Sequence, residues 1–276
     1  MHKKYGILAH PAGHSLSPAI FNAAFKEAGL DAEYRVYDVA EEKLAEFMNV
    51  VKHEPVSGLS VSLPHKEAVI SYLDEVDEDA RGVGAVNCVV NRGGFLYGYN
   101  TDFVGSNKAL EEAVGELRGR KVVVIGAGGA ARAVVYGLLK EGASVSIVNR
   151  HKEKAEKLAS EFSGVFGREV LSGGMEDADK FDGEILVQAS SIWTLNPESE
   201  LRDLIPGDFV KKFDIVMDIV YKPLMTPLLK AAESMGKTVI TGEKMLLYQA
   251  VEAFKLFTEK DAPVGVMKKE LSENLV

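Results

Sequence analysis

The chain is short of cysteine, of basic residues and of long apolar runs, and each shortage excludes a class of protein. Its single cysteine, Cys88, cannot form an internal disulfide, so we expect a protein of the reducing cytoplasm. No run reaches about 18 apolar residues and no secretory h-region is present, so we expect no membrane partner. Lys and Arg number 32 against 41 Asp and Glu, and the resulting formal charge of -9 argues against nucleic acid as a partner.

The remaining composition is that of an ordinary globular protein. Hydrophobic residues make up 46% and charged residues 26% of the 276 residues, which excludes disordered and collagen-like classes. This length suits one large domain or two moderate ones. The oligomeric state stays open between a monomer and a homodimer.

The second half alternates strand-like and helix-like segments, which is typical of a parallel sheet with helices on its faces. Residues 122–125 form a continuous β-branched run, and residues 130–139 follow with apolar positions three and four apart. Residues 163–183 are rich in Ser, Gly and acidic residues, and we expect them to be a mobile connection. Further strands are expected at 144–148, 184–187, 215–220 and 238–240, with a helix at 151–162.

A glycine cluster, residues 126–129, lies on the first strand-to-helix turn of this half. Gly126 permits a tight turn, Gly128 lets the backbone approach a pyrophosphate, and Ala131 lets the helix lie close to the sheet. The helix N-terminus then offers its unpaired N–H groups to phosphates. The sequence therefore predicts a dinucleotide site, the alternative being a turn kept small only for packing.

The next strand ends in Asn149-Arg150, about 20 residues on, where such a site contacts the ribose of the cofactor. A carboxylate there would select NAD, whereas the Arg150 guanidinium can bind a 2′-phosphate and Lys154 adds a second positive charge. NADP is therefore the expected cofactor. The alternative is that both cations belong to a solvated helix face with Glu153 and Glu156.

The first hundred residues show a separate alternation. We expect strands at 5–9, 34–39 and 58–62 and helices at 18–28, 41–51 and 66–73. A helix near 102–114 leads into the glycine-rich half, so the first domain should comprise residues 1–104 and the second residues 105–242. The last helix, near 243–257, has an apolar face that could pack back on the first domain, so residues 243–276 are assigned to that domain.

Short polar clusters occupy the loops that follow the strands of the first half. Taken singly, Ser15, Ser17 and Ser62 could be helix caps and Asn87 a turn residue. Together with a lysine and an aspartate, these hydroxyls and amides suit a small polyhydroxylated acid better than an apolar ligand.

The order of these motifs along the chain resembles that of the shikimate dehydrogenase family, and the resemblance covers essentially the whole sequence. It implies an N-terminal α/β substrate domain and a Rossmann-type doubly wound parallel sheet for NADP, with a cleft between them and a C-terminal helix that returns to the first domain. The segments that carry it are His14-Ser15-Leu16-Ser17-Pro18; Val61, Pro64 and Lys66; Gly84-Ala85-Val86-Asn87; Asn100-Thr101-Asp102; Gly126-Ala127-Gly128-Gly129-Ala130-Ala131-Arg132; Asn149-Arg150; and Met245 to Gln249.

The same resemblance implies reversible hydride transfer between NADPH and the C3 carbonyl of 3-dehydroshikimate, which gives shikimate. Lys66 and Asp102 match the catalytic pair that handles the proton; read alone, Lys66 would be a surface lysine and Asp102 a helix N-cap. Tyr221 matches a substrate-binding position of the family, but it could instead be a core aromatic at the end of a strand. The matched substrate-binding positions are Ser15, Ser17, Ser62, Asn87, Thr101, Tyr221 and Gln249. The matched cofactor positions are Gly126, Gly128, Gly129, Ala130, Asn149, Arg150, Lys154 and Gly242. No metal is expected.

Two departures from the family pattern bear on function. Ser60-Val61-Ser62 stands where the family has Asn-Val-Thr, which keeps a quinate/shikimate dehydrogenase open as an alternative. Gln188 begins a stretch that usually begins with Asn, and the only tryptophan, Trp193, lies there, in our interpretation as local packing and not as a cleft wall. A non-catalytic ligand-sensing relative is a further alternative, opposed by the retained Lys66 and Asp102. Another two-domain NADP enzyme acting on a folate-like carbonyl would leave the serine and asparagine groups unexplained.

Overall fold

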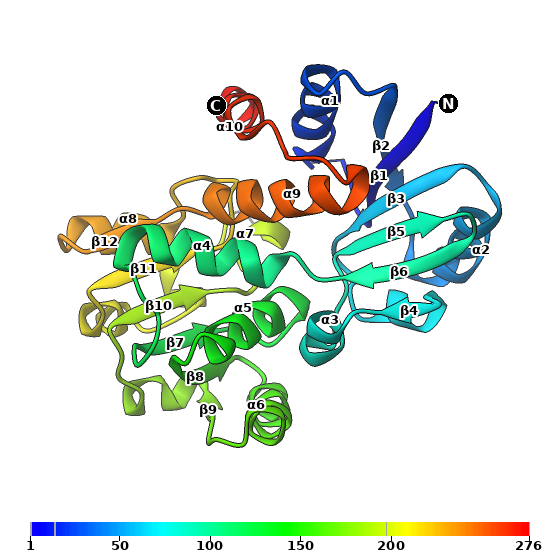
Figure 1. Ribbon diagram of the computed structural model, residues 1–276. Coiled ribbons are helices and arrows are strands. Elements are labelled where there is room, and N and C mark those ends of the chain that lie inside the picture. Colours follow the sequence, from blue (N-terminus) through cyan, green and yellow to red (C-terminus); the bar gives the residue numbers. More distant parts are fainter. Residues whose placement is uncertain (1, 14, 197, 276) are drawn as a thin grey trace. The chain divides into compact units, whose positions relative to one another are not determined.

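The computed structural model describes residues 2–13, 15–196 and 198–275 (Figure 1). It divides into two compact units: one contains the residues up to Thr101 and those from Gln249 onward, and the other is Asp102–Tyr248. Helix α9 (Gly242–Thr258) begins in the second unit and continues in the first. No helix of the described part combines the length and the hydrophobicity that crossing a bilayer requires.

The first unit is built on a mixed sheet with the strand order β2-β1-β3-β5-β6-β4. β1 pairs in parallel with β2 and β3, whereas β5 runs antiparallel to β3 and β6. The strands are β1 (Lys3–Ala9), β2 (Ala32–Asp38), β3 (Val56–Val61), β4 (Glu75–Val76), β5 (Cys88–Arg92) and β6 (Phe95–Tyr99). The other elements are α1 (Ser17–Glu27), α2 (Leu44–His53), α3 (Glu78–Val83), α10 (Val264–Asn274) and the 3-10 helices η1 (Glu41–Lys43) and η2 (Ala68–Tyr72).

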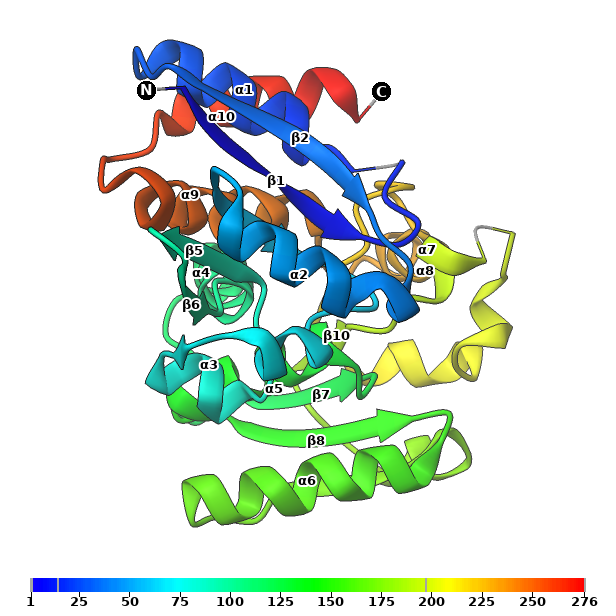
Figure 2. The same ribbon diagram turned by 90° about the vertical axis from the view of Figure 1, so that its right-hand side faces the viewer.

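Helices cover both faces of this sheet because its strands alternate their side chains between two apolar layers. On one face α1 and α10 lie side by side (Figures 1 and 2), and Tyr5 of β1 packs against Phe257 of α9, with ring centroids 5.0 Å apart. The Tyr5 hydroxyl also donates a hydrogen bond to the Phe257 carbonyl. On the other face Leu8, next but two along β1, belongs to a buried cluster with Met48 of α2 and Val69 of η2. The C-terminal part of α9 is thus an integral part of the first unit.

The second unit is a wholly parallel sheet with the order β12-β11-β10-β7-β8-β9. Counted from β7, this is the doubly wound order 3-2-1-4-5-6, whose switch point lies between β7 and β10. The strands are β7 (Lys121–Ile125), β8 (Ser144–Asn149), β9 (Leu171–Gly174), β10 (Ile185–Gln188), β11 (Ile215–Asp218) and β12 (Thr238–Ile240). The helices are α4 (Asp102–Val114), α5 (Gly129–Lys140), α6 (Lys152–Phe166), α7 (Ile192–Leu195), α8 (Pro227–Ser234) and the 3-10 helices η3 (Met175–Lys180), η4 (Leu201–Asp203) and η5 (Gly207–Lys212).

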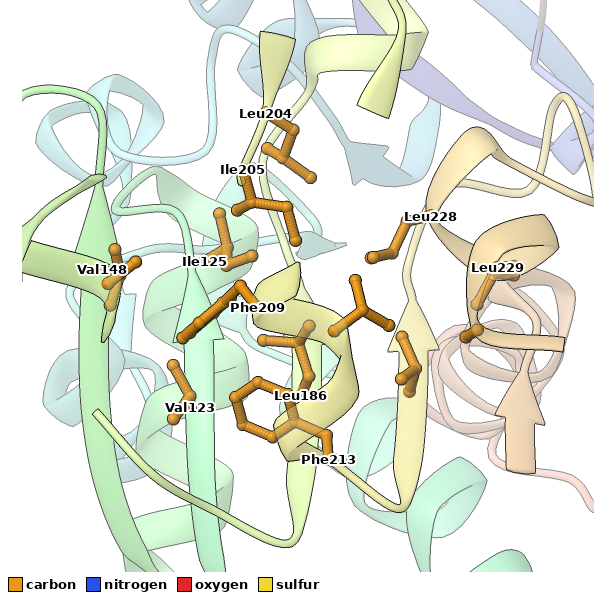
Figure 3. Close-up of a cluster of buried hydrophobic side chains, with 14 of the residues drawn as sticks. Val123, Ile125, Val148, Leu186, Leu204, Ile205, Phe209, Phe213, Leu228 and Leu229 are labelled. Carbon is orange, nitrogen blue, oxygen red and sulfur yellow. The ribbon is translucent and has the colours of Figure 1, made fainter. Parts of the chain in front are cut away.

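A large apolar core lies between this sheet and the segments that connect β9 to β12. Figure 3 shows Val123, Ile125 and Leu186 of the strands beside Phe209 and Phe213 of η5. Trp193 belongs to the same core with no exposed surface, and its indole N–H donates to the Ser199 carbonyl at 2.9 Å. Its interpretation as packing is therefore confirmed.

The expected α/β class with a doubly wound parallel sheet is confirmed, and several local expectations are corrected. Residues 163–183 are not a mere connection, because they hold the end of α6, the edge strand β9 and η3. The helix expected at 66–73 is the short 3-10 helix η2. The hairpin of β5 and β6 was not expected, although Gly93 and Gly94 form its two-residue turn with φ of +66° and +93°.

Candidate active site

Most of the polar residues expected to bind substrate lie at one edge of the first sheet. β1 and β3 run in parallel and end at this edge, β5 begins there, and β6, antiparallel to β5, ends there. The residues that follow or precede these strand ends are Ser15, Ser17, Ser62, Lys66, Asn87 and Thr101. The topology therefore gathers side chains from four separate stretches of the chain. His14, which belongs to the first of the expected motifs, lies outside the described residues.

The serines are held by the backbone at the ends of β1 and β3. Ser17 opens α1 and is only 5% exposed, and its N–H donates to Ser15 Oγ at 3.2 Å. Ser62 follows β3, and its N–H donates to the Leu8 carbonyl at 2.9 Å. Ser60 is buried within β3 while Ser62 is half-buried, so the Ser60 departure from the family pattern lies in the packing and the Ser62 departure at the edge.

Asn87 and Thr101 form a buried polar pair at the same edge. The Asn87 side chain accepts a hydrogen bond from the Thr101 N–H at 2.6 Å, and its amide donates to Thr101 Oγ1 at 2.9 Å. The Asn87 carbonyl accepts from the Val61 N–H at 2.7 Å. This pair fixes Thr101, and with it the peptide that leads into Asp102.

Lys66 and Asp102 belong to different units. Lys66 is half-buried in the turn between β3 and η2, where its carbonyl accepts from the Val86 N–H at 2.7 Å. The preceding residue, His65, is also anchored, with Nε2 2.7 Å from the Val39 carbonyl. Asp102 is the first residue of α4 and is only 4% exposed. A nearly buried carboxylate at a helix start is consistent with both the catalytic and the capping interpretation of Asp102.

The glycine turn of the second unit fits a dinucleotide pyrophosphate. Gly126 has a φ of +122°, and a Cβ there would lie 3.0 Å from the backbone of Ala189 and Ser190, so only glycine suits the turn. Gly128 is different: its φ is -91°, and a Cβ would meet no protein atom within 4 Å. This glycine therefore leaves open space at the start of α5, where the N–H groups of Gly129 and Ala130 belong to the first helical turn. Ala131 is fully buried against the sheet, as the third small position requires.

The cations expected to read a 2′-phosphate lie at the end of β8 and the start of α6. Asn149 ends β8, and its side-chain amide donates to the His151 carbonyl at 2.9 Å, which shapes the turn that carries Arg150. Arg150 and Lys154 are exposed, and within the described ranges neither forms an ion pair. Glu153 and Glu156 pair instead with His151 and Lys152. This arrangement weakens the alternative of a solvated helix face, because the two cations are not engaged by the neighbouring glutamates.

The three remaining expected positions lie after β11 and on α9. Tyr221 is half-buried after β11, and burial raises the pKa of its phenol. Gln249 is half-buried on α9. Gly242 begins α9, and a Cβ there would lie 2.6 Å from the Val220 carbonyl carbon, so close backbone packing alone explains this glycine. The cofactor role expected for Gly242 stays a prediction.

Sequence reasoning missed one polar cluster. Asp218 ends β11 with no exposed surface, and it accepts hydrogen bonds from Gln188 and Thr226, which are also fully buried. The signal available in the sequence was a carboxylate at the end of the apolar run 215–217. In the part of the chain that the structure describes, no group of three or more His, Cys, Asp or Glu side chains is placed to hold a metal ion.

The doubly wound sheet and the glycine turn at its switch point define a dinucleotide-binding α/β protein. Its other unit carries polar side chains along one edge of its sheet. Three family models match the chain: the shikimate dehydrogenase substrate binding domain over residues 7–89, the shikimate/quinate 5-dehydrogenase over 108–191, and the shikimate 5′-dehydrogenase C-terminal domain over 242–271. The chain belongs to the shikimate dehydrogenase family, which confirms the resemblance found in the sequence.

Individual relatives are similar to this chain over nearly the full length of both proteins. A shikimate dehydrogenase (NADP+) of Thermococcus kodakarensis is 42% identical, over 98% of this chain and 96% of its own. A crystal structure of a shikimate dehydrogenase in complex with NADP+ superposes with a TM-score of 0.92 at 37% identity, covering 100% of this chain and 96% of the other. The Thermus thermophilus shikimate 5-dehydrogenase in complex with NADP(H) and shikimate gives a TM-score of 0.87 at 33% identity, covering 99% and 100%.

Proposed function

We propose that this protein catalyses the reversible reduction of 3-dehydroshikimate to shikimate with NADPH as the hydride donor. The observation that carries the proposal is the full-length similarity to NADP+-dependent shikimate dehydrogenases, together with Lys66 and Asp102 at the matched positions. The first unit, which includes the C-terminal residues, would bind the substrate, and the second unit would bind NADP. A single buried cysteine supports a cytoplasmic location.

The residues at the edge of the first sheet supply the contacts that the substrate needs. Hydroxyls of Ser15, Ser17 and Ser62 can donate to a carboxylate and pair with ring hydroxyls. The amide of Asn87 and the hydroxyl of Thr101 are already fixed by each other, so they meet the ligand with little loss of side-chain entropy. Gln249 of the first unit and Tyr221 of the second unit are the remaining proposed substrate contacts.

Reduction of a ketone places negative charge on its oxygen, and a nearby acid lowers that barrier. NADPH supplies the hydride when bound. In the proposed reaction the pair Lys66 and Asp102 supplies the proton at the oxygen. In the reverse direction the same pair takes the proton from the shikimate hydroxyl.

The second unit holds the cofactor through its own backbone and cations. The space above Gly128 and the N–H groups of Gly129 and Ala130 receive the pyrophosphate. Arg150 and Lys154, neither of them paired with an acidic group in the described residues, bind the 2′-phosphate. Asn149 shapes the turn that presents Arg150.

The decisive experiment is a panel of substrates and cofactors with the purified protein. Shikimate and quinate are each offered with NADP+ and with NAD+, and 3-dehydroshikimate is offered with NADPH, while the absorbance of the reduced nicotinamide is followed. We expect turnover of shikimate with NADP+ to exceed that of the other three oxidation pairs, and we expect 3-dehydroshikimate to be reduced with NADPH. Quinate is the second candidate substrate, because Ser62 is smaller than the family's threonine and lies half-buried at the sheet edge. Absence of turnover with every pair would refute the proposal.

A further inference from the structure

A carboxylate, Asp218, is buried at the carboxyl end of the second sheet and is not used by the proposed chemistry. It has no exposed surface. Its Oδ1 accepts from the Val220 N–H at 2.9 Å and from Gln188 Nε2 at 3.2 Å, and its Oδ2 accepts from Thr226 Oγ1 at 2.7 Å. Three donors from three places in the chain therefore converge on one side chain.

The partners of Asp218 connect the ends of two neighbouring strands and one helix. Gln188 ends β10 and Asp218 ends β11, and the Gln188 carbonyl also accepts from the Ile219 N–H at 3.0 Å. Thr226 caps α8 by accepting from the Leu229 N–H at 3.3 Å. The segments after β10 and β11 and the start of α8 are consequently held as one body.

The segments held in this way border the glycine turn. The Gln188 side chain bonds both the N–H and the carbonyl of Ser190, and the Ser190 N–H lies 3.0 Å from where a Cβ of Gly126 would be. On the other side, a Cβ on Gly242 would lie 2.6 Å from the Val220 carbonyl carbon, and Val220 leads into Tyr221. The carboxyl ends of parallel strands next to the switch point are where doubly wound sheets bind their ligands.

Burial of a carboxylate is costly, and an apolar side chain would fill this position more cheaply if packing were its only role. Asp218 is nevertheless buried, at a place where its three hydrogen-bond donors fix two loop segments. We propose that Asp218 is a positioning residue for the cofactor: by holding Gln188, Val220 and Thr226, it fixes residues 189–190 and 219–221 in the conformation that receives NADP. This inference rests on the proposed NADP site but not on the identity of the substrate.

Variants at Thr226 provide the matched test, because they leave the carboxylate in place. Thr226→Val removes the hydroxyl with almost no change of shape, and Thr226→Ser retains it. NADPH affinity is measured without turnover, from the quenching of Trp193, the only tryptophan, and from calorimetry. We expect the Val variant to bind NADPH about tenfold more weakly, as loss of one buried hydrogen bond would produce, and the Ser variant to stay within about twofold of the parent. In the oxidation of shikimate, the KM for shikimate should change less than the KM for NADP+.

A purely structural role predicts a different outcome. If Thr226→Val lowers the melting temperature yet binds NADPH as tightly as the parent at a temperature well below melting, the inference is overturned. Equal loss of affinity in the Val and Ser variants would overturn it as well. Should Thr226→Val fail to fold, Asp218→Asn is measured in the same way, since it keeps the shape and one acceptor but removes the charge. A parent protein that binds NADPH but does not turn over shikimate would refute the proposed function while leaving this comparison decisive.

Discussion

Lys152 and Asp177 form an ion pair between the start of α6 and η3, with Nζ 3.1 Å from Oδ2. The Lys180 ammonium reaches the other oxygen of the same carboxylate, and hydrogen bonds from these two lysines lower the pKa of Asp177 to about 2. Lys152 is therefore already paired with the Asp177 carboxylate, whereas Arg150, two residues earlier, has no ion pair among the described side chains. The two cations stand close in sequence but differ in what they can offer a ligand.

This difference predicts the effect of substitution on cofactor choice. Arg150→Gln should weaken NADP+ binding by about tenfold or more, because a charge-assisted bidentate contact to the 2′-phosphate is lost. NAD+ binding should be unchanged, since NAD+ has no 2′-phosphate. Lys152→Gln is the control and should leave the ratio of the two affinities as it was. Both ratios follow from KM values for NADP+ and NAD+; an equal effect on the two cofactors in Arg150→Gln would contradict the assignment.

The two glycines of the turn should respond in opposite ways to the same methyl group. Gly126→Ala should lower the free energy of unfolding by about 2 kcal/mol or more, because the positive φ and the contact with residues 189–190 are both unfavourable for alanine. Gly128→Ala should leave stability within about 0.5 kcal/mol, because the methyl meets no protein atom, but it should weaken NADP+ binding. Denaturant unfolding and calorimetric titration check the pair. Intact cofactor binding in Gly128→Ala would show that the open space is not the phosphate site.

Replacement of the proposed catalytic pair should remove turnover but not cofactor binding. Lys66→Ala and Asp102→Asn should each lower kcat by about a hundredfold or more, the range that general acid–base groups supply. NADPH binding, measured in the absence of substrate, should persist in both variants because the glycine turn and Arg150 are unaltered. Normal turnover in either variant would remove that residue from the mechanism.

The Asn87–Thr101 pair predicts a substrate-specific loss. Thr101→Val leaves the buried amide of Asn87 without its hydroxyl partner, which should cost about 1 kcal/mol in stability and raise the KM for shikimate. Thr101→Ser keeps the hydroxyl and should restore most of the affinity. The KM for NADP+ serves as the internal control, and a change in it as large as that for shikimate would count against a substrate-side role.

Much of the fold could be predicted from the sequence where apolar periodicity was strong. The helix expected near 102–114 is α4 (Asp102–Val114), and the run at residues 122–125 lies in β7. β9 was not predicted, because it is an edge strand of Leu, Ser and two glycines, and its leucine, Leu171, is 49% exposed. Such a strand is recognisable only through the β8 backbone to which it bonds.

The candidate site, too, has a part that the sequence predicts and a part that it does not. The gathering of Ser15, Ser62 and Asn87 at one sheet edge follows from strand direction, so loop composition was a sufficient guide. The cluster around Asp218 could not be predicted from the sequence, because its side-chain partners lie 30 and 8 residues away along the chain. Only the pairing of β10 with β11 brings Gln188 and Asp218 together, and a sequence pattern does not state which strands pair.

Burial of Asp218 also predicts how stability depends on pH. Desolvation raises the pKa of this carboxyl from 3.8 to about 7 in the folded protein, against the opposing effect of its three hydrogen bonds. Between about pH 4 and pH 7 the folded state therefore binds more protons than the unfolded state, and the free energy of unfolding contributed by this group falls as the pH rises, by at most ~1.4 kcal/mol per pH unit. Above pH 7 both states are ionised and the contribution is constant.

The other titrating groups are removed by comparing the protein with Asp218→Asn, which has no carboxyl at this position. The difference in unfolding free energy, parent minus variant, should decrease from about pH 4.5 to pH 7 and then level off. Urea unfolding at several pH values measures this difference. Parallel curves for the two proteins across that range would mean that Asp218 stays ionised in the folded state, and that the three donors outweigh the cost of its burial.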